Sequence, residues 1–328
     1  MRLPTRYIPR FLKNCVPGYR RHWRRNYGAL LHGIQECIPT LAFGGTDGVP
    51  WVQVRGGGPR LHGFWTEADD AELYDNLRPD LPRTLPRPYF RLVRDYLTRY
   101  CYPHMRPDLK PLGFPVTRMG GFHGQHKDAI ADLVNAADRE RLIAAFRPGC
   151  DDITIDCGAF LGFGALRLAA DTPEGMVVAV EASAACHALL ERNVVHNGTG
   201  NVVPVRRGIW STESIRTLES SYAQANSLVP EVHTGDHTVS VETTNIDSLA
   251  VSLSLARVDM ISLTINGAEP EALAGAAKTL AVHRPRIRLA GWYRRDGRLI
   301  SSICSEFLVD FDYDVFVGGR GSTLALPR

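Results

Sequence analysis

An acidic residue and two glycines stand where a doubly wound fold would bind a nucleotide-like ligand. The β-branched run at residues 153–155 ends in Asp156, Gly158 and Gly162 follow, and an apolar stretch at helical spacing begins at Phe163. This order predicts a strand, a tight turn and a helix. In doubly wound α/β folds such a turn holds the ligand at the carboxyl end of the first strand. A glycine lets the backbone approach the ligand, because it carries no Cβ.

The glycine spacing distinguishes between two classes of cofactor. A dinucleotide fingerprint has G-x-G-x-x-G and an acid about 20 residues on, whereas Gly158 and Gly162 are four residues apart and Asp156 comes just before them. The pattern D-x-G-x-x-x-G is more similar to an S-adenosylmethionine turn. The second expected strand, residues 176–180, ends in Glu181, whose carboxylate can accept bonds from both hydroxyls of a ribose. A structural glycine turn beside an incidental surface glutamate is the alternative, because short motifs also match by chance.

The expected cofactor-binding residues belong to this turn and to the end of the second strand: Asp156, Cys157, Gly158, Ala159, Phe160, Gly162, Glu181, Ala182 and Ser183.

Two histidines, His123 and His126, lie three residues apart beside glycines. They could offer a base or metal ligands, but no third ligand is spaced with them. Because a metal site needs at least three protein ligands, we expect no metal, and surface or packing histidines are the alternative.

Composition limits the class of protein. A chain of 328 residues fits one large domain and a smaller one, and a net charge of +3 is too small to indicate nucleic-acid binding. The seven cysteines include no C-x-x-C pair, so we expect neither a disulfide framework nor a zinc site. No apolar run approaches the roughly 18 residues of a membrane span, so we expect a soluble, cytoplasmic protein. The oligomeric state is left open.

The first 35 residues are basic and aromatic, and no acid precedes Glu36. Pro9, Pro17 and Gly18 interrupt any long helix. A solvated basic arm is one interpretation, and a peripheral contact with an anionic surface is the sharper one. The prolines argue against a transit peptide.

The elements that must position these residues fall into two regions. Over residues 1–118, strands at 40–43, 51–54 and 61–65 predict a small antiparallel sheet, with helices at 67–77 and 89–100. Over residues 119–328, strands alternate with helices, which predicts a doubly wound, mostly parallel α/β sheet. Strands are expected at 153–155, 176–180, 201–205, 237–242, 258–265 and 286–292, with a terminal hairpin at 313–317 and 323–326.

The expected helices of this second region have recognisable ends. Residues 127–146 form the first, and the helix after the turn starts at 163. Ser183 caps the next helix, which stops at Asn197-Gly198. Asp247 starts the following one, and residues 267–281 and 300–308 form the last two. Residues 210–238 read as a polar loop, long enough to cover a substrate.

Four ordered motifs are similar to those of the FkbM family of S-adenosylmethionine-dependent methyltransferases, over roughly residues 145–328. They are I-D-C-G-A-x-x-G at 155–162, V-E at 180–181 with L-x-x-N-x-x-x-N-G at 190–198, T-T-x-I-D at 243–247, and V-D at 258–259 leading to G-A-E at 267–269. The resemblance implies a Rossmann-like methyltransferase that transfers a methyl group to a hydroxyl of a small molecule, such as a glycan or secondary metabolite.

The chain departs from the family in the last motif. The family usually has K-x-D-x-E-G-A-E, and Ser262, Thr264 and Asn266 replace the three charged residues. Neutral groups can orient a hydroxyl but cannot take its proton at neutral pH. The residues expected on the acceptor side are Thr264, Asn266, Glu269, His123 and His126.

Two other functions stay open. A catalytically degenerate pseudo-methyltransferase would keep the cofactor pocket and bind a partner through the basic arm. A nicotinamide-dependent dehydrogenase is disfavoured because the third glycine is missing from its place.

Overall fold

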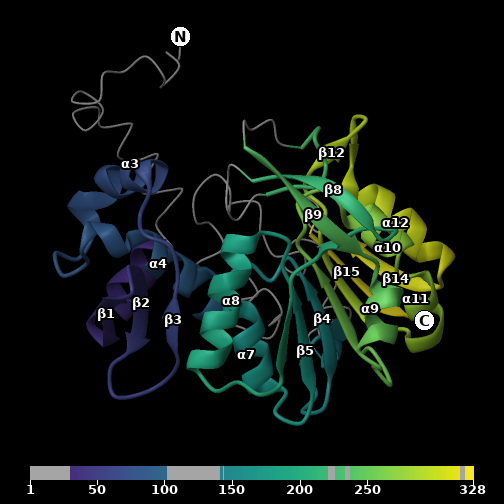
Figure 1. Cartoon of the computed structure of the whole chain (residues 1–328), viewed down its shortest axis with the longest axis horizontal. Helices are drawn as coiled ribbons and strands as arrows, with labels where there is room; N and C mark the ends of the chain where they lie inside the picture. Colours follow the sequence, from purple (N-terminus) through teal and green to yellow (C-terminus); the bar gives the residue numbers. More distant parts are fainter. Residues whose placement is uncertain (1–29, 102–140, 143, 221–225, 233–236, 318–321) are drawn as a thin grey trace.

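The computed structural model describes residues 30–101, 141–142, 144–220, 226–232, 237–317 and 322–328. Within them a central sheet carries helices on both faces, and a smaller sheet with its own helices lies beside one helical layer (Figure 1). This arrangement confirms the expected α/β fold with a doubly wound sheet.

Over the described residues, the central sheet has seven strands in the order β14-β15-β11-β10-β4-β5-β6. They are β4 (Ile153–Cys157), β5 (Met176–Val180), β6 (Val202–Val205), β10 (Met260–Leu263), β11 (Arg286–Ala290), β14 (Tyr313–Val317) and β15 (Ser322–Pro327). Neighbours pair in parallel except at β15, which is antiparallel to β11 and β14. The expected terminal hairpin therefore extends the main sheet. The chain winds from β4 to β6 in one direction and from β10 to β11 in the other, so the winding direction changes between β4 and β10.

The two faces of the sheet have separate cores. In β5, Val177 and Ala179 belong to the same buried cluster as residues of α7 (Phe163–Asp171) and α8 (Ala184–His196). The alternating Val178 and Val180 belong to the cluster that includes residues of α9 (Ile246–Ser252), α10 (Glu269–Ala274), α11 (Ala277–His283) and α12 (Ile300–Asp310). Among the described residues, no helix is both long and apolar enough to cross a membrane.

The N-terminal region contains the expected antiparallel sheet, formed by β1 (Leu41–Thr46), β2 (Val49–Val54) and β3 (Arg60–His62). Its helices are α3 (Ala68–Leu77) and α4 (Phe90–Asp95), and α4 continues as a π-helix over Tyr96–Cys101. The buried cluster that includes Leu190 of α8 also includes Leu61 and Leu92, so the region shares a core with α7 and α8. The expected boundary near residue 118 lies outside the described residues.

A third sheet occupies part of the expected 210–238 loop, where the loop prediction was wrong. It pairs β7 (Gly208–Ile209) with β9 (Thr238–Thr244), and β9 with β8 (Ser214–Glu219). Four of the six residues of β8 are not buried. The strand therefore lacks the apolar alternation that marks a half-buried strand in a sequence.

The single helix expected over residues 267–281 is two helices, α10 and α11. They are separated at Gly275, where a Cβ would lie 2.6 Å from the Trp210 carbonyl oxygen and 2.7 Å from the Asn245 Cβ. The close approach of the segment before α9 requires a glycine at this point, and the helix breaks there.

The expected role of Asp247 was also wrong. Asn245 caps α9 by accepting from the Ser248 N–H at 2.8 Å, and the helix begins at Ile246. The Asp247 carboxylate instead accepts the backbone N–H groups of Lys278 and Thr279, at 3.0 and 2.8 Å. It therefore caps α11, a contact between elements distant in sequence.

Candidate functional site

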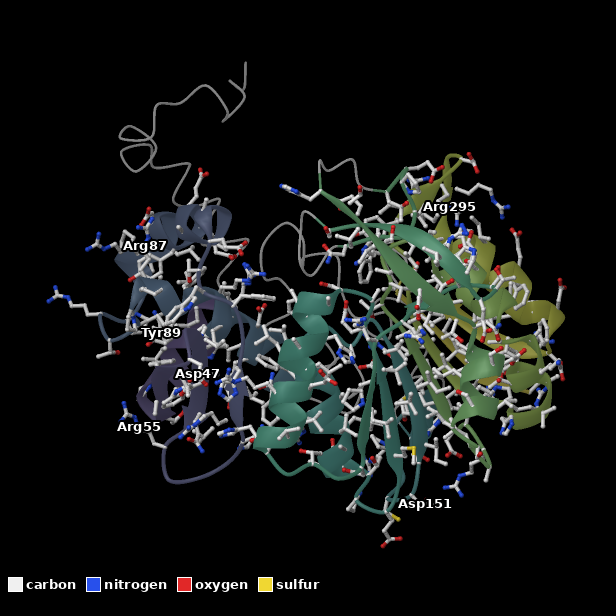
Figure 2. All side chains as sticks on the ribbon, viewed as in Figure 1. Asp47, Arg55, Arg87, Tyr89, Asp151 and Arg295 are labelled. Atoms are coloured by element: carbon white, nitrogen blue, oxygen red, sulfur yellow. The ribbon has the colours of Figure 1, made fainter. Side chains whose placement is uncertain are left out.

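A cleft opens at the carboxyl ends of β4, β5 and β10, where the winding direction changes. Asp151 marks the opposite, amino end of the sheet, and Arg295 lies on the carboxyl side (Figure 2). Counting its part that is open to solvent, the cleft measures about 590 Å³. From these three strand ends it is lined by Gly158, Phe160, Glu181, Ala182, Thr264 and Asn266. Ligands of doubly wound folds bind at this place.

The two glycines of the turn permit close packing within the protein. Gly158 has a φ of +84°, and a Cβ there would lie 2.1 Å from the Thr264 carbonyl oxygen. Gly162 has a φ of +77°, and a Cβ would lie 2.3 Å from Cδ1 of Leu190. The turn therefore lies directly against the end of β10 and against α8, which fixes its position in the cleft.

Glu181 organises the turn from the neighbouring strand end. One carboxylate oxygen accepts the Phe160 N–H and the other accepts the Ser183 N–H, both at 2.9 Å. The first bond holds Phe160 in a left-handed conformation, with a φ of +54°, which is uncommon for a bulky residue. The side chain is therefore fixed at the end of β5, where it lines the cleft.

Five of the expected cofactor residues are not among those that line the cleft: Asp156, Cys157, Ala159, Gly162 and Ser183. Cys157 is fully buried, and burial, with the Asp156 charge second, raises the pKa of its thiol well above the ordinary range. Ser183 caps α8 as expected, by accepting from the Cys186 N–H. These residues shape the strand ends.

The end of β10 brings Thr264 and Asn266 to the cleft, but not Glu269. The Glu269 side chain is fully buried, and its two oxygens accept the N–H groups of Ile265 and Gly267 at 3.1 and 2.9 Å. Burial raises the pKa of its carboxyl to about 7. Glu269 thus organises the loop that carries Asn266, and it is not placed to touch a ligand in the cleft.

Residues between β6 and β9 form the other side of the cleft, and the sequence did not indicate them individually. They are Arg207, Gly208, Ile209, Leu218, Asn226 and Leu228. The expectation that residues 210–238 cover a substrate included Leu218, Asn226 and Leu228, but not Arg207, Gly208 or Ile209. It pointed to the segment but not to its apolar contacts.

The N-terminal region contacts the turn between β4 and α7 through α8 and through the Phe64 ring. The Asn193 side-chain amide on α8 donates to the carbonyl oxygens of Leu161 and His62, both at 2.9 Å, and its oxygen accepts the His62 N–H at 2.6 Å. The Phe64 ring packs on Phe160 with centroids 6.1 Å apart. Residues next to β3 therefore support the wall of the cleft.

His123 and His126 lie outside the described residues. Within the part of the chain that the structure describes, no group of three or more His, Cys, Asp or Glu side chains could hold a metal ion.

Comparison with known proteins gives a family match. Residues 156–309 match the model of the methyltransferase FkbM domain, and no curated protein matches the chain. Among solved structures, the methyltransferase FkbM of Methylobacillus flagellatus KT is 14% identical with a TM-score of 0.42, and the match covers 62% of this chain and 58% of that one. Fibrillarin of Aeropyrum pernix with natively bound S-adenosyl-L-methionine is 15% identical with a TM-score of 0.34, over 53% and 65%. A putative O-methyltransferase of Klebsiella pneumoniae is 16% identical with a TM-score of 0.33, over 60% and 81%.

Proposed function

Residues 156–309 of this chain are a methyltransferase FkbM domain, and from this premise we propose that it transfers a methyl group from S-adenosylmethionine to a hydroxyl of a small molecule, such as a glycan or a secondary metabolite. The observation that carries the proposal is the fixed Glu181 carboxylate in a cleft at the change of winding direction.

The residues of the cleft fit this cofactor. A carboxylate at the end of β5 can accept hydrogen bonds from the hydroxyls of a ribose, and Gly158 and Ala182 leave the adjoining wall without bulky side chains. When bound, S-adenosylmethionine supplies a methyl group on a positively charged sulfur, which is a good leaving group. The task of the protein is then mainly to align donor and acceptor.

The end of β10, where we place the methyl acceptor, brings no charged side chain to the cleft. Among the described residues that line the cleft, Glu181 is the one carboxylate and Arg207 the one cation. Thr264 and Asn266 at the end of β10 are neutral and cannot remove a proton at neutral pH. The proton of the hydroxyl therefore passes to water or to a group outside the described residues, where His123 and His126 stay candidates.

A second function, a cofactor-binding protein without transferase activity, is favoured by one observation. Ser262, Thr264 and Asn266 stand where the family usually has a lysine, an aspartate and a glutamate. Because function depends on the site and not on the fold, binding and turnover have to be measured separately.

Calorimetry with S-adenosylmethionine and with NAD tests the cofactor. We expect binding of the first and none of the second, and the reverse result would contradict the proposal. Transfer of a labelled methyl group to fractionated metabolites then tests the activity. Cofactor binding with no transfer to any fraction would favour the second function, and transfer to a nitrogen or carbon atom would contradict O-methylation.

A further inference from the structure

A short segment covers the cleft beside the end of β10. We name residues 226–232 the roof segment. Its Ser227 exchanges backbone hydrogen bonds with Glu219 at the end of β8, at 2.9 and 3.2 Å. Leu228 lines the cleft and packs against Gly208, where a Cβ would lie 2.9 Å from its Cδ1. Val232 packs so closely on Gly267 that a Cβ there would be 2.6 Å from Cγ2 of the valine.

Asn266 connects the end of β10 to this segment. Its side-chain N–H donates to the Asn226 carbonyl oxygen at 2.8 Å, and its own carbonyl oxygen accepts the Ser227 hydroxyl at 2.8 Å. The Tyr293 hydroxyl lies 3.5 Å from its side-chain oxygen. Asn266 and Ser227 are both buried. Both ends of the Asn266 amide therefore face protein groups.

The geometry imposes two chemical requirements on position 266. The residue has a φ of +53°, a conformation that glycine and asparagine adopt more readily than other residues. It must also donate a hydrogen bond to a carbonyl oxygen, which an ionised carboxylate cannot do. Asparagine meets both requirements, and an ionised acid would set oxygen against oxygen at Asn226.

We propose that Asn266 is a positioning residue that fastens the roof segment over the cleft and so retains the bound cofactor. It is not an acid, a base or the group that orients the acceptor. The inference rests on the proposed function for the identity of the ligand, and on the hydrogen bonds for the fastening.

Two variants test the donor. Asn266→Gly allows the left-handed backbone and removes the side-chain amide. Asn266→Asp keeps the size of the side chain and replaces its N–H donor with a carboxyl oxygen. We expect Asn266→Gly to weaken S-adenosylhomocysteine binding roughly tenfold at pH 5.5 and at pH 8. Asn266→Asp should lose at least as much at pH 8. It should approach wild-type affinity at pH 5.5, because burial and the facing Asn226 carbonyl oxygen raise the pKa of an aspartate at this position, and the protonated carboxyl can donate to that oxygen.

At each pH, the affinity of a variant for S-adenosylhomocysteine is expressed as a ratio to the wild-type affinity at the same pH. The titratable and charged groups near position 266 are Tyr293, the buried Glu269, Glu271 and Arg295. Arg295 reaches the Gly267 carbonyl oxygen, and Glu219 comes from the side of the roof segment. Because the wild type shares these groups, the ratio isolates residue 266. Glu231→Gln, an exposed change in the roof segment, is the matched control and should bind as the wild type does.

Amide hydrogen exchange of residues 227–232 without ligand gives a readout independent of activity. Faster exchange in both Asn266 variants, with the control unchanged, supports the fastening. Wild-type exchange and wild-type affinity in Asn266→Gly would overturn it, and so would an Asn266→Asp loss that is the same at both pH values. If the wild type binds no S-adenosylhomocysteine, the proposed function fails, while the exchange rates still decide whether Asn266 fastens the segment.

Discussion

Glu269 makes the stability of the protein depend on pH in an unusual direction. Its buried carboxyl holds the backbone N–H groups of Ile265 and Gly267, and burial raises its pKa from 4.5 to about 7. Below pH 4.5 the group is protonated in both the folded and the unfolded chain. Between pH 4.5 and 7 the folded state keeps a proton that the unfolded state releases, so this contribution to stability is lost as pH rises.

The size of the effect follows from the pKa difference. A rise from 4.5 to about 7 corresponds to about 3 kcal/mol, fully expressed above pH 7. Glu269→Gln removes the titration. It also places an amide N–H against a backbone N–H, which costs about 1–3 kcal/mol at every pH.

Urea unfolding at pH 4.5, 5.5, 6.5 and 8 measures the difference between the wild type and Glu269→Gln. We expect the free energy of unfolding of the wild type, relative to that of Glu269→Gln, to fall by about 3 kcal/mol between pH 4.5 and pH 8. Glu231→Gln serves as the exposed control. An advantage that is constant over this range, or one that grows with pH, would refute the reasoning.

Three further predictions concern the supports of the cleft. Gly158→Ala should destabilise the fold by about 3 kcal/mol or more, because its Cβ would lie 2.1 Å from the Thr264 carbonyl oxygen in a left-handed backbone; urea unfolding measures this, and a near-neutral change would contradict the packing. Asn193→Ala should cost about 2–3 kcal/mol in the same assay, because the Leu161 carbonyl oxygen loses its donor; an unchanged midpoint would show that the amide does not hold the turn. Deletion of residues 1–25 should leave the unfolding midpoint and cofactor affinity unchanged, whereas loss of soluble expression would show that this arm packs into the core.

The central sheet and its turn could be predicted because their signals are local. β-branched runs ending at Asp156 and Glu181 gave the two strands, and Ser183 and Asn197 gave the ends of α8. Each of these signals depends on backbone preferences within a few residues.

The missed features depend on contacts between distant segments. Asp247 carries a helix-start signal but caps a different helix, α11. Asn193 belongs to a motif of the sequence, yet its bonds to Leu161 and His62 appear only when the N-terminal sheet packs on α8. Glu269 follows the end of β10, but the direction of its side chain, into the core and away from the cleft, depends on how the loop before α10 folds.

The central claim is that the Glu181 carboxylate binds the ribose of S-adenosylmethionine. Titration calorimetry with S-adenosylhomocysteine and with its 2′-deoxyribose analogue, on the wild type and on Glu181→Ala, tests the contact directly, and Glu191→Ala, an exposed change on α8, serves as control. We expect the wild type and the control to prefer the ribose ligand by roughly tenfold, about 1.4 kcal/mol, because a charge-assisted bond is made to the hydroxyl. Glu181→Ala should bind both ligands equally and S-adenosylhomocysteine at least about tenfold more weakly than the wild type does. The same preference for the ribose ligand in Glu181→Ala as in the wild type would contradict the claim.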